Sequence, residues 1–311
     1  MNRQLIWFNG QLIPKDKALI SIFSPTAQYG VNVFEGIRCY WNAKKGSLYG
    51  FRVKEHLDRL IESCRIIGIV SRYSKDEIIS LLKHVIQANE FKEDIAIRIT
   101  IFVDGEGSWH SIEPVSMFIA PFRKPRSNLL QIHGLKAAVS SWFRINDNVL
   151  PPRAKVGANY MNSRYAYIQA QKDGYDLPIF LGQDGKVAES SGACLMTIRN
   201  GVLSTPPIYS SILESITRDT IIQLAREEGM IVSERIIDRT ELYLADEVFI
   251  CGSAAEITPI VMVDRFIIGS GSPGPITLKL LDKYHSIVTG EDERHPEWRT
   301  ELYRDNTSDA N

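Results

Sequence analysis

Lys155 is a residue of this 311-residue chain whose type and surroundings could support catalysis. It lies among small residues in the run Arg153-Ala154-Lys155-Val156-Gly157. A lysine amine becomes a nucleophile when burial or nearby positive charge lowers its pKa from about 10.4. Because a single lysine in such a run is usually an ordinary surface residue, a chemical role requires other residues that would serve the same ligand.

Two further segments could hold a flat, anionic ligand. Glu189 precedes Ser190–Ala193, and a carboxylate beside such small residues suits contact with a flat ring. The segment Leu213–Asp219 opens a helix, whose free N–H groups and the Thr217 hydroxyl form a site for an anion. The alternatives are a glutamate in a plain turn and ordinary capping of the helix by Ser215.

A third segment, Gly252–Pro259, follows an apolar strand and begins with small residues. Small side chains let backbone N–H groups approach a ligand closely, although a simple turn between strands is the alternative. For each of these three segments the plain structural interpretation is favoured when the segment is taken alone.

Helices and strands alternate in both halves of the chain to position these residues. Asn9–Gly10 is a strong turn signal between Leu5–Phe8 and Gln11–Ile13. Apolar periodicity predicts helices at Val53–Gly68, Lys75–Asn89, Tyr160–Lys172, Ile216–Gly229 and Ile276–Val288. Strands are predicted at Ile95–Val103, Met117–Ala120, Ala137–Trp142, Leu177–Leu181, Leu195–Ile198, Val202–Ser204, Met230–Arg235 and Glu247–Cys251. With no glycine-rich dinucleotide fingerprint and no regular βαβ order, we expect an α+β or mixed α/β fold.

Breaks in this pattern divide the chain into two domains. Prolines and polar residues around Pro121 and Pro125 predict a small N-terminal α/β domain over 1–124 and an interdomain loop over 125–136. A larger C-terminal domain is expected over 137–300. The polar residues 301–311 are expected to form a frayed tail.

Composition excludes several classes of function. The chain is 44% hydrophobic and 23% charged, with a net charge of −1, which argues against nucleic acid or an acidic membrane as the main partner. No apolar run has transmembrane length, and the first ten residues lack the apolar core of a signal peptide. The four cysteines, Cys39, Cys64, Cys194 and Cys251, form no metal-binding pattern. We therefore expect a cytoplasmic protein with reduced cysteines and no metal.

Taken together, these segments resemble the class IV aminotransferases, the fold-type IV family of pyridoxal 5′-phosphate (PLP) enzymes, and most of all its branched-chain amino acid branch. The resemblance extends from Ile6 to Pro275. It implies the two-domain, D-amino acid aminotransferase-like fold. The motifs that carry it are Tyr29-Gly30, Val33–Tyr40, His56–Leu60, Ala154–Tyr160, Ile216–Asp219, Leu242–Phe249 and Ala254–Pro259.

The resemblance implies a set of cofactor-binding residues. Lys155 corresponds to the lysine that holds PLP as a Schiff base, and Glu189 to the glutamate that bonds the pyridine nitrogen. Tyr160 corresponds to the tyrosine near the phenolic oxygen of the cofactor. The phosphate would be held by Arg59, Ile216, Thr217 and Ser253.

It also implies substrate and partner residues. Ser253 and Ala254 lie where backbone amides receive the α-carboxylate of the substrate. The substrate-pocket positions are Phe34, Gly36 and Arg98. Tyr29 corresponds to a residue contributed by the partner subunit, and the loop 104–110 to one that reaches the partner's site, so we expect a homodimer or larger homo-oligomer.

Arg98 has two interpretations. It lies in the apolar run Ile95–Ile101, where a buried arginine requires an anionic partner. It could receive the side-chain carboxylate of glutamate, the usual amino donor, or form a structural ion pair within the strand layer.

Three positions depart from the family pattern. Cys194 replaces an asparagine, Ala96 replaces a tyrosine two residues before Arg98, and the segment Pro121–Pro125 is altered. The predicted reaction is transamination between L-leucine, L-isoleucine or L-valine and 2-oxoglutarate. Alternatives are a specialised amino acid or amine as substrate, and the activity of a D-amino acid aminotransferase or an aminodeoxychorismate lyase. A further alternative, PLP binding without catalysis, is disfavoured because Lys155 and Glu189 are both present.

Overall fold

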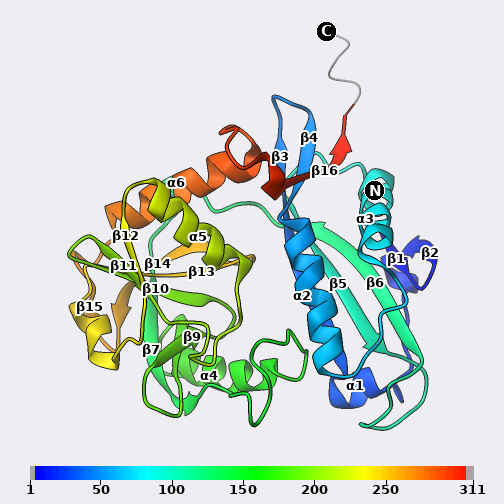
Figure 1. Ribbon diagram of the computed structural model, residues 1–311, viewed down its shortest axis with the longest axis horizontal. Coiled ribbons are helices and arrows are strands. Elements are labelled where there is room, and N and C mark those ends of the chain that lie inside the picture. The colour runs from blue at the N-terminus through cyan, green and yellow to red at the C-terminus, as the bar shows by residue number, and fades with distance from the viewer. Residues whose placement is uncertain (1–3, 306–311) are drawn as a thin grey trace. The chain divides into compact units, whose positions relative to one another are not determined.

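The computed structural model describes residues 4–305, which divide into two compact units (Figure 1). Unit 1 runs through Arg126 and also contains Ala154–Ala158 and the chain from Ser286 onward. Unit 2 contains Ser127–Arg153 and Asn159–His285. This division differs from the predicted domains, because Lys155 and the residues from 286 to 300 were expected in the C-terminal domain. Pairing with strands distant in sequence draws both segments into unit 1.

A seven-stranded sheet forms the framework of unit 1, and all of its pairings are antiparallel. Its order is β16 (Arg299–Arg304), β4 (Ser47–Phe51), β3 (Asn32–Asn42), β5 (Ile95–Val103), β6 (Val115–Arg123), β1 (Leu5–Phe8) and β2 (Gln11–Pro14). The strand β16 shows that residues 301–304 of the expected frayed tail are ordered. Residues 306–311 of that tail lie outside the described residues.

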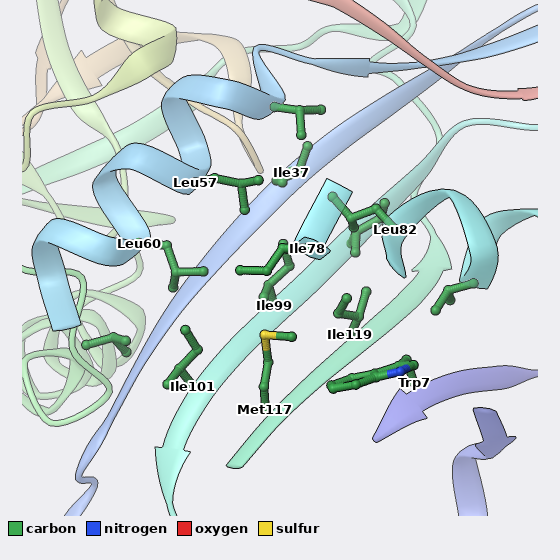
Figure 2. Packing of buried hydrophobic residues seen from close by; sticks show 14 of the residues in the cluster. Trp7, Ile37, Leu57, Leu60, Ile78, Leu82, Ile99, Ile101, Met117 and Ile119 are labelled. Carbon is green, nitrogen blue, oxygen red and sulfur yellow. The ribbon is translucent and has the colours of Figure 1, made fainter. Parts of the chain in front are cut away.

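Two helices, α2 (Val53–Ile66) and α3 (Lys75–Asn89), cover one face of this sheet. Strand alternation turns the odd-numbered isoleucines of β5 toward them, so Ile99 packs with Leu57 and Leu60 of α2 and with α3 (Figure 2). Complete burial of each such side chain contributes about 1.5–3 kcal/mol. The opposite face of the sheet is left to the even-numbered residues of β3 and β5. The short helix α1 (Pro25–Tyr29) precedes β3.

Unit 2 is built on a nine-stranded mixed sheet. Its order is β12 (Ile231–Glu234), β11 (Val202–Thr205), β10 (Cys194–Arg199), β13 (Glu247–Gly252), β14 (Glu256–Val263), β7 (Leu135–Phe143), β8 (Leu177–Leu181) and β9 (Val187–Ser190), with β15 (Phe266–Ile267) beside β14. Because β9 also pairs with β10, the strands from β10 through β14, β7 and β8 to β9 close into a ring.

Three helices complete unit 2. α4 (Tyr160–Lys172) lies against β7 and β8, and α5 (Ile216–Glu227) lies against β12 and β13. α6 (Pro275–Thr289) begins at the Glu247 carboxylate, which accepts hydrogen bonds from the backbone of Ile276 and Thr277. Short 3-10 helices occur at Lys15–Lys17, Leu129–Gln131, Arg239–Leu244 and Pro296–Trp298. None of the helices within residues 4–305 is both long and apolar enough to cross a membrane.

The predicted α+β class is confirmed, and most predicted elements are present at or near their expected bounds. The ranges Lys75–Asn89, Ile95–Val103, Tyr160–Lys172 and Leu177–Leu181 are reproduced to the residue. β3 and β4 have no counterpart among the predicted strands, and β6 extends past the expected break at Pro121.

Candidate active site

Lys155 is fixed to unit 1 through its backbone. Its N–H donates to the Ser63 hydroxyl of α2 at 3.0 Å, and its carbonyl accepts from the Phe34 N–H at 3.0 Å. Val156 forms a β-bridge with Val33 at the start of β3. At Gly157 a Cβ atom would lie 2.6 Å from the Asn32 side chain, so glycine permits this close approach.

The predicted pocket residues of β3 and β5 share the sheet face away from the helices. Gly36 lies directly opposite Arg98 in the strand register, and a Cβ atom added at Gly36 would meet nothing within 4 Å, so the space above it is open. The Cζ atom of Arg98 is 4.1 Å from the centroid of the Phe34 ring, and Lys155 Nζ is 5.2 Å from the same centroid. Lys155, Phe34 and Arg98, predicted from the motifs, are therefore neighbours in unit 1.

Arg59, the predicted phosphate ligand on α2, is held by Glu35. Arg59 Nε donates to Glu35 Oε1 at 2.6 Å, and Nη2 donates to Oε2 at 2.9 Å. Burial alone would raise the pKa of the fully buried Glu35, but the charge of Arg59 and the hydrogen bonds from His56 and Arg59 outweigh it and hold that pKa well below its usual range. The two bonds use two of the five N–H donors of the guanidinium and fix its plane.

His56 completes this cluster between β3 and α2. Its Nδ1 lies 2.7 Å from Glu35 Oε2. Burial lowers the pKa of His56, Glu35 raises it, and the positive charges of Arg59 and Lys155 lower it further, so the net shift is downward. His56 is therefore neutral at pH 7 and donates its Nδ1 proton to the Glu35 carboxylate.

In unit 2, Glu189 lies buried in β9 against Arg144. Arg144 Nε and Nη2 each approach Glu189 Oε1 at 2.8 Å. Asn162 on α4 accepts from Arg144 Nη1 at 3.3 Å and orients it. Arg144 and Asn162 were not among the predicted site residues. The sequence offers no signal for them, because Arg144 precedes Glu189 by 45 positions and simply follows an ordinary strand.

Cys194, the departure from the family pattern, lies beside the same carboxylate. Its Sγ is 3.9 Å from Glu189 Oε2 and 3.6 Å from the Leu213 carbonyl oxygen. A thiol is only a weak donor, so it adds little to the stabilisation of the Glu189 charge. Cys251 lies opposite Cys194 in the strand register, and burial raises the pKa of the Cys251 thiol well above its usual value.

The predicted anion-binding segment begins next to Glu189. The Leu213 N–H lies 3.3 Å from both Glu189 carboxylate oxygens, and α5 starts three residues later. Ser215 caps α5 by accepting from the Arg218 N–H at 3.2 Å, as the plain structural interpretation predicted. Ile216 and Thr217 are the first two residues of the helix, where the helix dipole and the backbone N–H groups of the helix end favour an anion.

The remaining predicted residues lie at chain turns and helix ends. Ser253 and Ala254 form the turn between β13 and β14, and the preceding Gly252 packs against Gly192 close to Glu189. Tyr160 is the first residue of α4 in unit 2. Tyr29 ends α1 in unit 1 with an exposed side chain. Each unit thus holds its own part of the predicted set.

Comparisons with known proteins identify the family that this chain matches. Residues 32–263 match the family described as amino-transferase class IV. A probable branched-chain-amino-acid aminotransferase of Aquifex aeolicus is 39% identical over 302 residues, covering 96% of this chain and 96% of that protein.

Two solved structures extend the similarity to the fold. The PLP form of a branched-chain amino acid aminotransferase from Thermobaculum terrenum has a TM-score of 0.92 at 43% identity, covering 97% of this chain and 99% of that one. A branched-chain aminotransferase from the thermophilic archaeon Thermoproteus uzoniensis, solved with norvaline, has a TM-score of 0.90 at 39% identity, covering 96% of this chain and 99% of that one.

This chain belongs to the class IV aminotransferase family. The relatives just described are all named as branched-chain aminotransferases, so the resemblance to that branch is confirmed along with the family.

Proposed function

We propose that this protein is a PLP-dependent aminotransferase that moves an amino group between L-leucine, L-isoleucine or L-valine and 2-oxoglutarate. The observation that carries the proposal is the buried Glu189 carboxylate, which is held by Arg144 and lies beside the segment that opens α5. A fixed anion next to a helix N-terminus suits a ligand with a cationic ring nitrogen at one end and a phosphate at the other. The identities to branched-chain aminotransferases support the substrate class.

The donor set of the chain fits this cofactor. Bound PLP supplies an aldehyde that bonds to amines and a ring that accepts electrons from the substrate Cα. In unit 2, Glu189 would keep the ring nitrogen protonated, and the family pattern assigns Tyr160 to the phenolic oxygen. The same pattern assigns the phosphate to Arg59 of unit 1 and to Ile216, Thr217 and Ser253 of unit 2.

Lys155 would hold the cofactor through its side-chain amine, which is the nucleophile of the assigned set. The same Nζ would be the base that takes the proton from the substrate Cα. The backbone bonds to Ser63 and Phe34 fix residue 155 in position for this work.

One surface of unit 1 accounts for the two kinds of amino acid that such a reaction requires. The Phe34 ring offers an apolar contact to a branched side chain, and Arg98 offers a cation to the side-chain carboxylate of glutamate. Gly36, opposite Arg98 in the strand register, adds no side chain to this surface. The family pattern assigns the α-carboxylate to the backbone amides of Ser253 and Ala254 in unit 2.

We further infer that the protein acts as a homodimer or larger homo-oligomer in the cytoplasm. Large apolar side chains are exposed along α4 in unit 2 and, separately, around Tyr29 in unit 1, and exposed apolar patches are typical of subunit interfaces. In the assembly, Tyr29 and the loop 104–110 serve the site of the partner subunit. The free cysteines at 39, 64, 194 and 251 support a reducing compartment.

The proposal is tested by a half-reaction without keto acid. The purified protein is loaded with PLP, mixed separately with L-isoleucine, L-glutamate, D-alanine and an (R)-arylalkylamine, and followed by the visible absorbance of the bound cofactor. Rapid loss of this absorbance with both L-isoleucine and L-glutamate is expected.

The other outcomes identify the alternatives. A response to L-glutamate alone keeps the aminotransferase but assigns a specialised amino acceptor, for which Ala96 and Cys194 provide the structural reason. A response to D-alanine or the amine alone contradicts the branched-chain assignment. Absence of visible cofactor absorbance contradicts the role of Lys155.

A further inference from the structure

We propose that Glu256 is a positioning residue that holds the Ser253–Ala254 turn in place. It does so by binding Ser127 and His285, which are the first and last residues of unit 2 in the sequence. The inference rests on the proposed function, because it concerns the turn assigned to the substrate carboxylate and the cofactor phosphate. All of the residues involved belong to unit 2.

Three hydrogen bonds converge on a single atom, Glu256 Oε2. The backbone N–H and the hydroxyl of Ser127 each donate to it at 2.8 Å. His285 Nε2 lies 3.3 Å from it and 3.4 Å from the Ser127 hydroxyl. The Glu256 side chain is 2% exposed, so its charge depends on these protein groups and not on water.

Ser127 and His285 occupy special positions along the chain. Ser127 is the first residue of unit 2 after the chain leaves unit 1, and His285 is the last residue before the chain returns to unit 1 within α6. The Glu256 carboxylate therefore bonds the β13–β14 hairpin to the two residues at which the chain enters and leaves unit 2.

The backbone of Glu256 supplies an independent observation. Glu256 pairs with Gly252 and closes the turn formed by residues 253–255, and its φ is +52°. Glycine or asparagine is the usual choice in this left-handed conformation, so a glutamate here is strained. Such strain persists where a side chain has another task, and strained residues cluster at functional sites.

The strain and the bonds together fix the orientation of the turn. Glu256 follows Ala254 by two residues, and the hydroxyl of Thr258 further ties the Ala255 carbonyl oxygen at 2.7 Å. Because Glu256 and Thr258 hold the turn at its C-terminal end, the amides of Ser253 and Ala254 keep one orientation. Removing the carboxylate should therefore weaken the binding of the substrate carboxylate more than it slows proton transfer at Lys155.

The test compares Glu256→Gly, Glu256→Gln and Ser127→Ala in the PLP-loaded enzyme. Glu256→Gly removes the carboxylate and also relieves the strained φ, so a residue needed only for the backbone would tolerate it. Glu247→Gln is the matched control, because Glu247 is also buried in unit 2 and binds backbone and hydroxyl groups, but at the start of α6. Equilibrium binding is measured with L-2-methylleucine, which has no Cα proton to lose, and the half-reaction with L-isoleucine gives the maximum rate.

We expect Glu256→Gly to weaken binding of L-2-methylleucine by about tenfold or more, with a change of less than about threefold in the maximum rate. Glu256→Gln and Ser127→Ala should lie between this variant and the wild type. Glu247→Gln should lower the melting temperature and leave binding unchanged. If Glu256→Gly fails to fold, the comparison of Ser127→Ala with Glu247→Gln decides.

Unchanged binding in Glu256→Gly, or in Ser127→Ala where the first variant does not fold, overturns the positioning role. Equal losses of binding and maximum rate overturn it as well. These results differ from a failure of the proposed function, in which the wild-type protein itself gives no half-reaction with any of the amino acids.

Discussion

Glu189 is surrounded at the scale of single residues by groups that define its charge. Arg144 supplies a paired guanidinium, Leu213 supplies a backbone N–H, and Cys194 adds a weak thiol donor. Because the carboxylate is buried and paired, it remains an anion that can receive a proton-bearing ring nitrogen. Lys155, in unit 1, is positioned differently, because hydrogen bonds of its backbone hold it in place.

Replacing Lys155 by alanine should remove the covalent bond to the cofactor and lower turnover by about 10²–10⁴-fold, because no other amine is assigned to the Cα proton. The fold should remain intact, since the backbone bonds of residue 155 persist. Visible absorbance, turnover and circular dichroism are the measurements, with Lys172→Ala on the exposed end of α4 as the control. A yellow, active Lys155→Ala protein contradicts the assignment.

Replacing Glu189 by glutamine should leave PLP bound but slow proton abstraction from Cα by orders of magnitude, because the amide no longer keeps the ring nitrogen protonated. Half-reaction rates and cofactor content measure the two effects separately. Rates near those of the wild type would mean that another group protonates the ring.

Replacing Arg144 by methionine should cost about 3–5 kcal/mol of unfolding free energy, because it leaves the Glu189 carboxylate buried without its partner. Adding Glu189→Gln to that variant should recover part of the loss, since the isolated charge is then removed. Denaturant unfolding of the two single variants and the double variant forms the cycle. Additive losses would show that the pair is not coupled.

At the scale of elements, a buried charge cluster joins β3 to α2. Alternation along β3 turns Glu35 toward the helices among buried apolar residues. His56 and Arg59, one helical turn apart on α2, both contact its carboxylate. The cluster is satisfied internally, so it joins strand and helix at the point where Lys155 is anchored.

This cluster should make stability depend on pH. The folded protein lowers the pKa of both His56 and Glu35, so below about pH 6.5 the unfolded chain binds more protons and unfolding becomes easier as pH falls. His56→Asn should reduce the loss of stability between pH 7.5 and 5.5, measured as the denaturant midpoint. His84→Gln, at an exposed position of α3, is the control and should follow the wild type.

Local pattern is sufficient to predict elements such as α3 and β5, because their apolar residues repeat at helical or alternating spacing. β3 escapes prediction because buried polar residues, Glu35 and Arg38, interrupt its alternation. β16 escapes because Arg299–Arg304 is mostly polar and becomes a strand only by pairing with β4. The roles of the motif residues stay predictions, whereas Arg144, Asn162 and Glu35 could not be predicted because their contacts are distant in sequence.

The whole molecule is made of two units through which the chain passes more than once. Lys155 lies in the five-residue segment Ala154–Ala158, which belongs to unit 1, while Glu189 lies in unit 2. The exposed aromatic surface on unit 2 belongs to the same scale. Met161, Tyr165 and Ile168 share one face of α4, and Tyr165 stacks on Trp142 with 5.2 Å between ring centroids.

We expect Tyr165→Asp to shift the homo-oligomer toward monomers, because the charge would be buried in an apolar subunit interface. The dissociation constant should rise at least about tenfold, measured by light scattering after size-exclusion chromatography. Val70→Asp, at an isolated exposed position in unit 1, is the control. An unchanged mass distribution would place the interface elsewhere.

β16 has a practical consequence for handling the protein. It pairs with β4, whose Leu48 and Phe51 are buried, and so forms the outer border of the seven-stranded sheet. A chain shortened before Arg299 would leave the hydrogen-bonding groups of β4 open to strands of other molecules, which is a route to aggregation. Truncated or tagged versions made for purification should therefore keep the sequence through Arg304, and poor solubility of shorter versions would reflect this exposed border.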